Sequence, residues 1–147
     1  MAEKSGASRM ELCTNYEEGG TTPALSMVKF ARHYLTIPLY LMIRPRGGNF
    51  FYSDEEFKQM KTEISLFKSL KVDGFVFGIL DENNEVDINR NTELVTLASP
   101  LPCTFHRAFD ITPDYKKSLE TVINCGFKTI LTSGQSNDAL KRLGYFI

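Results

Sequence analysis

The residues best suited to chemistry in this sequence follow short apolar runs. Segment 104–110 (TFHRAFD) brings together His106, Arg107 and Asp110. An imidazole titrates near neutral pH and can act as a general acid or base, with Asp110 or a second acid, Glu11, fixing its tautomer. Glu11, His106 and Asp110 are therefore candidate catalytic residues. The alternative for His106 is a satisfied packing residue.

A second group of residues suits an anion. Arg44 and Arg46 flank a proline and precede Gly47 and Gly48, where backbone can approach a ligand. A helix predicted to start at Ser53 would add free N–H groups, and together these features favour a phosphate or carboxylate. The alternative is that one arginine pairs with a buried acid. Segment 132–134 (TSG) offers a hydroxyl and backbone N–H groups for an oxyanion. The candidate anion-binding residues are Arg44, Arg46, Arg107, Ser133 and Gly134.

Glu11 lies inside the apolar run Met10–Cys13, where a carboxylate is expected only if it is paired or functional. It has the same strand parity as Cys13, so both side chains are predicted to face a barrel interior, with Arg44 as the counter-charge. A purely structural ion pair is the alternative.

Five short apolar runs are predicted to be the strands that position these residues. Continuous apolar runs are typical of strands covered on both faces, as in a parallel sheet. The runs are Met10–Cys13, Leu39–Ile43, Phe75–Leu80, Cys103–Phe105 and Thr129–Leu131.

Helices are predicted between the strands. Thr22-Pro23 and Thr112-Pro113 each indicate a helix start with proline at the first helical position. Ser53 with Glu56 forms a capping box, and Asp87 is predicted to cap a further helix. The helix near Pro113 is expected to end at Cys125-Gly126, and another to begin within residues 136–142.

The runs recur about every thirty residues, the spacing of a (β/α)8 barrel of ~250 residues. We therefore expect an α/β fold: a partial TIM-type barrel of about five parallel strand–helix units, not closed, with residues 1–147 as one incomplete domain. A doubly wound sheet is the alternative. The open edges and open interior of the partial barrel are predicted to leave Leu41, Phe77 and Leu131 partly uncovered.

Composition narrows the class of protein. Seventeen basic and eighteen acidic residues give no excess of positive charge that would favour nucleic-acid binding. No apolar run is long enough to cross a bilayer. The three cysteines are odd in number and widely spaced, which favours reduced thiols. We expect a protein of the cytoplasm, with the nucleus as a second possibility, that binds neither nucleic acid nor membrane.

Six segments carry motifs in a fixed order: 6–13, 18–23, 43–50, 52–54, 104–110 and 131–135. Together they resemble the CutC copper-homeostasis family. The resemblance implies an eight-stranded barrel, often oligomeric, that handles monovalent copper. Cys13 matches a family cysteine proposed as a copper ligand, and thiolate is a soft donor. The family's partner cysteine would precede residue 1, and Cys103 and Cys125 do not match it. The family pattern extends past both ends, so a truncated form or isoform is expected.

Two functions from different classes follow from these observations. The first, which the order of the motifs favours, is a copper-homeostasis protein that holds monovalent copper through Cys13 and acts as a homo-oligomer. The alternative is a TIM-barrel enzyme that acts on a small anionic carbonyl substrate at the carboxyl ends of the strands. Whether the chain is catalytic stays open at this stage.

Overall fold

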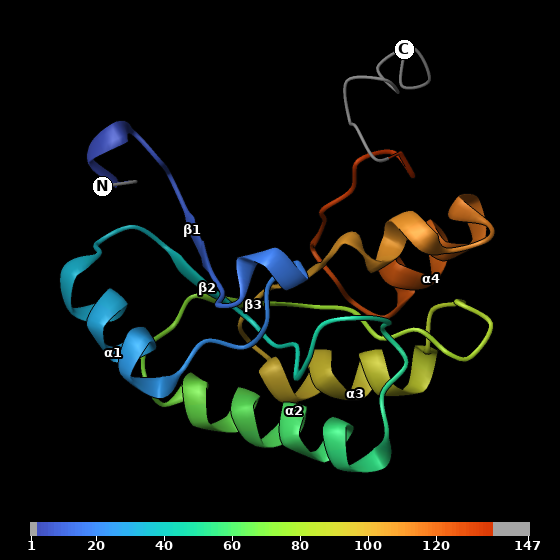
Figure 1. Ribbon diagram of the computed structural model, residues 1–147, viewed down its shortest axis with the longest axis horizontal. Helices are drawn as coiled ribbons and strands as arrows, with labels where there is room; N and C mark the ends of the chain where they lie inside the picture. Colours follow the sequence, from blue (N-terminus) through green and yellow to red (C-terminus); the bar gives the residue numbers. More distant parts are fainter. Residues whose placement is uncertain (1–2, 137–147) are drawn as a thin grey trace.

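The computed structural model describes residues 3–136, in which five strands alternate with four α-helices (Figure 1). Most of the predicted helix at 136–142 and the carboxyl-terminal segment lie outside the described residues. The elements are β1 (Met10–Leu12), α1 (Leu25–Tyr34), β2 (Leu39–Met42), α2 (Asp54–Lys68), β3 (Gly74–Phe77), α3 (Ile88–Ala98), β4 (Cys103–Phe105), α4 (Tyr115–Asn124) and β5 (Thr129–Ile130), with 3-10 turns η1 (Glu3–Ser5), η2 (Tyr16–Glu18) and η3 (Arg107–Ile111).

The strands form one parallel sheet in the order β1-β2-β3-β4-β5. This confirms the predicted open α/β architecture, because every strand lies within or against a predicted run. The third strand is shorter than expected and ends at Phe77. Beyond it the backbone leaves the ladder, since the N–H of Ile79 binds the side chain of Asn91 and that of Leu80 binds the carbonyl of Phe50.

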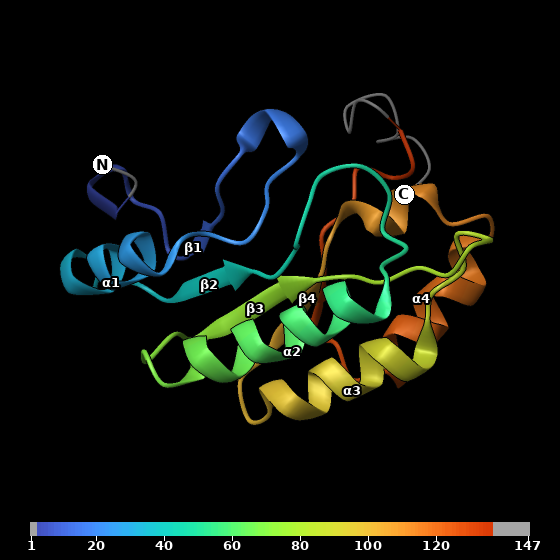
Figure 2. The same cartoon turned by 60° about the horizontal axis from the view of Figure 1, so that its bottom comes forward.

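Strand parity divides the sheet into two faces. One face carries Leu39, Leu41, Phe75 and Phe77, which are buried in the hydrophobic core. Helices α2 and α3 lie side by side along this face, and Figure 2 is turned so that they come forward. The prediction that Leu41 and Phe77 lose cover is therefore wrong, because they face the helices rather than the barrel interior. Leu131 is 44% exposed, as predicted.

The helix boundaries confirm some capping predictions. The capping box of Ser53 and Glu56 starts α2, and the Asp87 side chain caps α3 by accepting from the N–H of Arg90. Cys125 caps the end of α4, and Gly126 follows with a φ of 95° that favours glycine.

The two helices predicted to start at proline begin later. Helix α4 begins at Tyr115, because the Asp114 carboxylate accepts from the N–H groups of Lys116 and Lys117. Helix α1 begins at Leu25, since Thr22 does not cap it. The hydroxyl of Thr22 instead bonds both the backbone of Arg44 and the Glu63 carboxylate.

Candidate functional site

A cavity of ≈ 760 Å³ lies where the strands end. The loops after β1, β2, β4 and β5 all contribute to its wall, as expected for the carboxyl edge of a parallel sheet. The lining residues are Glu11, Leu12, Cys13, Tyr16, Glu17, Glu18, Gly19, Met42, Arg44, Phe50, His106, Arg107, Asp110, Ile111, Leu131, Gln135 and Ser136.

Arg44 holds two of these loops together from inside the protein. Its side chain is only 4% exposed, and Nη1 donates to the carbonyls of Glu18 and Gly20 at 2.8 and 2.9 Å. Nη2 donates to the carbonyl of Gly48 at 2.9 Å, and the guanidinium lies over the Phe50 ring. The guanidinium therefore joins the loop after β1 to the loop after β2.

The predicted pairing of Glu11 with Arg44 is wrong. Glu11 accepts from Arg9 at 2.6 Å, a residue on the same strand edge, while Arg44 turns to backbone carbonyls. A spacing of two residues along the strand brings Arg9 and Glu11 to one face, where they pair. Glu11 thus forms a structural ion pair, which is the alternative to a functional carboxylate.

Arg46 lies apart from the cavity, although the sequence grouped it with Arg44. It pairs with Glu56 at 2.6 Å and also donates to the carbonyls of Asn49 and Phe51. Burial opposes ionisation of Glu56, but the Ser53 N–H and Arg46 outweigh it and lower its pKa. The amino terminus of α2 is therefore capped and paired within the chain.

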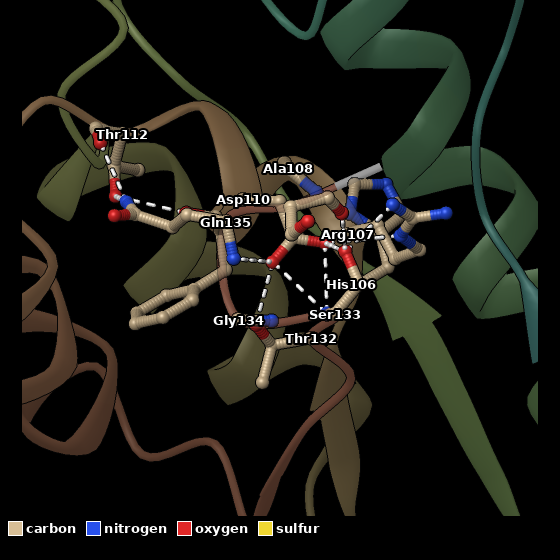
Figure 3. A network of polar contacts seen from close by, with 11 residues as sticks. His106, Arg107, Ala108, Asp110, Thr112, Thr132, Ser133, Gly134 and Gln135 are labelled. Atoms are coloured by element: carbon tan, nitrogen blue, oxygen red, sulfur yellow. Dashed lines mark hydrogen bonds and ion pairs between the residues drawn. The ribbon is translucent and has the colours of Figure 1, made fainter. Parts of the chain in front are cut away.

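The carboxylate of Asp110 lies against the turn at residues 132–134, where the sequence predicts a bound oxyanion (Figure 3). Its carboxylate accepts from the backbone N–H groups of Ser133 and Gln135 at 3.1 Å and from the Thr132 hydroxyl at 2.5 Å. Arg107 donates to the same carboxylate at 3.0 Å. The N–H of Gly134 binds the Thr132 hydroxyl. The N–H groups of Ser133 and Gly134 thus bind partners within the chain, and Arg107 and Ser133 bind the internal carboxylate of Asp110.

His106 is buried, with 3% of its surface exposed, and its tautomer is fixed by the backbone. Its Nδ1 accepts from the N–H of Ala108 at 3.3 Å, so the neutral ring carries its proton on Nε2. Burial, assisted by the nearby charge of Arg44, lowers the pKa of His106 to about 3. The expectation that Asp110 or Glu11 fixes the tautomer is wrong, because each carboxylate is bound elsewhere.

Cys13 lies beside a second sulfur atom that the sequence reading missed. Leu12 pairs with Leu41, so continuing this register by one residue brings Cys13 next to Met42. A Cβ built on Gly20 would stand 3.1 Å from the Cys13 sulfur and 2.9 Å from the Met42 sulfur. Both sulfur atoms therefore border the space beside Gly20. The parity that Met42 shares with Arg44 could have placed it on this face.

Among residues 3–136, no three His, Cys, Asp or Glu side chains are grouped to hold a metal ion. Cys103 and Cys125 are buried in the hydrophobic core, away from the cavity lining. The described part of the chain also contains no helix with the length and apolar character needed to cross a bilayer.

Comparison with known proteins places this architecture among relatives. The family model for the CutC family matches residues 1–145. Copper homeostasis protein cutC homologs from Mus musculus and Homo sapiens are 47% and 46% identical to the chain over 142 residues, which is 97% of the chain. The chain spans about half the length of these curated relatives, 52% in each.

A solved structure of CutC from Streptococcus agalactiae superposes with a TM-score of 0.86 and 43% sequence identity. The superposition covers 91% of this chain and 66% of that one.

Proposed function

The chain belongs to the CutC family, and from this we propose that it takes part in copper homeostasis by holding monovalent copper through Cys13. The observation that carries the proposal is that the Cys13 thiol and the Met42 thioether both border the space beside Gly20. Thiolate and thioether are the soft donors that select monovalent copper. Two such donors on neighbouring strands form a better copper site than one thiolate alone.

Negative charge at the cavity mouth also favours a copper cation. Glu17 and Glu18 lie exposed on η2 beside Cys13, and both line the cavity. Carboxylates at a mouth raise the local concentration of cations. Gly20 also leaves room beside the sulfur atoms, since any larger side chain there would meet both of them.

Titrating the reduced protein with monovalent copper under a competing chelator tests the proposal. We expect Cys13→Ser to weaken binding by at least about tenfold, the loss seen even when an outer partner of a metal is removed. Met42→Leu keeps the volume and removes the sulfur, and we expect it to weaken binding as well. Cys103→Ala is the matched control and should bind like the unaltered protein. Equal affinity for Cys13→Ser and the unaltered protein would overturn the proposal.

A copper site based on a thiol also bears on location. Thiols stay reduced in the cytoplasm and nucleus, so we propose the cytoplasm, with the nucleus second, as the compartment. Subcellular fractionation followed by immunodetection tests this. Recovery of the protein in an oxidising compartment would contradict it.

A further inference from the structure

We propose that the same cavity holds a second ligand, a small molecule whose carboxylate or phosphate group binds between Arg44 and His106. This goes beyond copper binding, because neither residue supplies a soft donor. The inference rests on two buried side chains that line the cavity, Arg44 and His106, each with a polar nitrogen that has no hydrogen-bond acceptor among the described residues.

Arg44 is a buried cation without a carboxylate. Its hydrogen bonds within residues 3–136 go to three backbone carbonyls, and the buried Tyr52 hydroxyl that also interacts with it is neutral, so no carboxylate there balances its charge. Carbonyl dipoles orient a guanidinium but do not neutralise it, and a buried charge is costly unless it is paired. An anion in the adjoining cavity would supply the missing countercharge.

His106 adds a hydrogen-bond donor. Because Nδ1 accepts from Ala108, the proton resides on Nε2, which has no partner among the described residues. A protonated Nε2 has no lone pair for a metal ion, so it calls for an acceptor. Thr104, two residues earlier on the same face of β4, also has a buried hydroxyl without a partner. Such groups in a native structure require an explanation.

The Phe50 ring packs against both Arg44 and His106. Its ring centroid lies 4.8 Å from the Arg44 guanidinium carbon and 4.9 Å from the His106 ring centroid. After burial, the charge of Arg44 is the next cause of the lowered pKa of His106. One oxyanion beside Phe50 would therefore meet a positive charge and an N–H donor together.

The rest of the cavity defines the kind of molecule. A volume of ≈ 760 Å³ is within the ~300–1,000 Å³ of small-molecule sites, and Leu12, Ile111 and Leu131 give the wall an apolar part. The acids Glu17 and Glu18 at the mouth would repel a polyanion. These features favour a small molecule with a single oxyanion group and an apolar body.

Chemical-shift titration of the 15N-labelled protein tests the site, with inorganic phosphate and propionate as separate probes. We expect saturable shifts at the amides of Gly19, Gly48 and Ala108, and the probe that binds more tightly identifies the oxyanion. His106→Phe keeps an aromatic ring but removes the donor, and we expect it to weaken binding by about tenfold. His106→Gln retains an N–H and should bind more tightly than His106→Phe.

His33→Phe is the matched control, because His33 is exposed on α1 and does not line the cavity. A thermal melt of each variant confirms that it is folded. Cys13→Ser should keep anion binding, so a failure of the copper proposal leaves this test intact. The inference is overturned if neither probe gives saturable shifts, or if folded His106→Phe binds like the unaltered protein.

Discussion

At the scale of single residues, the surroundings of a side chain decide its chemistry more than its type does. The three cysteines illustrate this. Burial raises the pKa of Cys103 to about 12 and also raises that of Cys125, whereas Cys13 is only half-buried and lines the cavity. The thiolate is the reactive form. The two core cysteines should therefore react slowly, because they are buried and because their raised pKa keeps them protonated.

We predict that iodoacetamide alkylates Cys13 well before the other two cysteines at neutral pH. Peptide mass spectrometry over a time course measures the three rates on one sample. The folded protein should show a single early site, and denaturant should make the rates alike. Early labelling of Cys103 in the folded protein would contradict the assignment of Cys13 as the accessible thiol.

Asp110 gives a second prediction at this scale. Burial opposes its ionisation, but hydrogen bonds from Thr132, Arg107 and the Ser133 and Gln135 amides outweigh it, so its pKa lies below the ordinary 3.8. A lowered pKa contributes stability that is present above pH 3.8 and is lost as the pH falls through the folded value. Asp110→Asn should lower the free energy of unfolding by about 2 kcal/mol near neutral pH, since bonds to a charged group are removed.

Urea unfolding at several pH values measures both effects of Asp110→Asn. The difference from the unaltered protein should shrink as the pH falls below 3.8. Glu82→Gln is a suitable control, because that side chain is exposed on the loop between β3 and α3. A constant difference at every pH would show that the carboxylate charge does not stabilise the turn.

The sequence could place these residues on the correct edge but could not assign their partners. Parity put Glu11, Cys13 and Arg44 on one face, and they do line one cavity. The anion of the 132–134 turn was not predictable, because Asp110 lies 23 residues from Ser133 and meets it only through the packing of two loops. Met42 was missed because an apolar residue within a strand reads as core.

At the scale of elements, strands were easier to predict than helix starts. A continuous apolar run has few alternatives once it is flanked by turn residues, so all five strands were found. A proline after threonine is compatible with a helix start, but a competing cap can move that start. Asp114 does so in α4, and the contact of Thr22 with Arg44 does so in α1.

Asp114→Ala should therefore destabilise the protein by about 1 kcal/mol, the usual cost of losing an N-cap side chain. Two backbone N–H groups, those of Lys116 and Lys117, lose their acceptor. Urea unfolding measures the change, and Ser53→Ala at the capping box of α2 provides a comparison of similar size. No loss of stability would indicate that α4 is capped in another way.

At the scale of the whole molecule, the described sheet has two edge strands, β1 and β5. Unpaired strand edges are templates for association, so we predict that the protein self-associates through them. Analytical ultracentrifugation across a range of concentrations should show a growing oligomer fraction. Phe30, 66% exposed on α1, offers another surface, and Phe30→Ser should leave edge association unchanged. A monomer at every concentration would refute the prediction.

The hydrogen bonds of Asp110 to the loop after β5 affect how often that loop can open. One carboxylate holds the amides of Ser133 and Gln135, so the loop after β5 cannot part from η3 unless these bonds break together. Both amides should then exchange with deuterium at a common rate, set by one opening event. The β4–β5 side of the cavity wall would open as a unit. A ligand that enters or leaves through that side could do so no faster than this opening occurs.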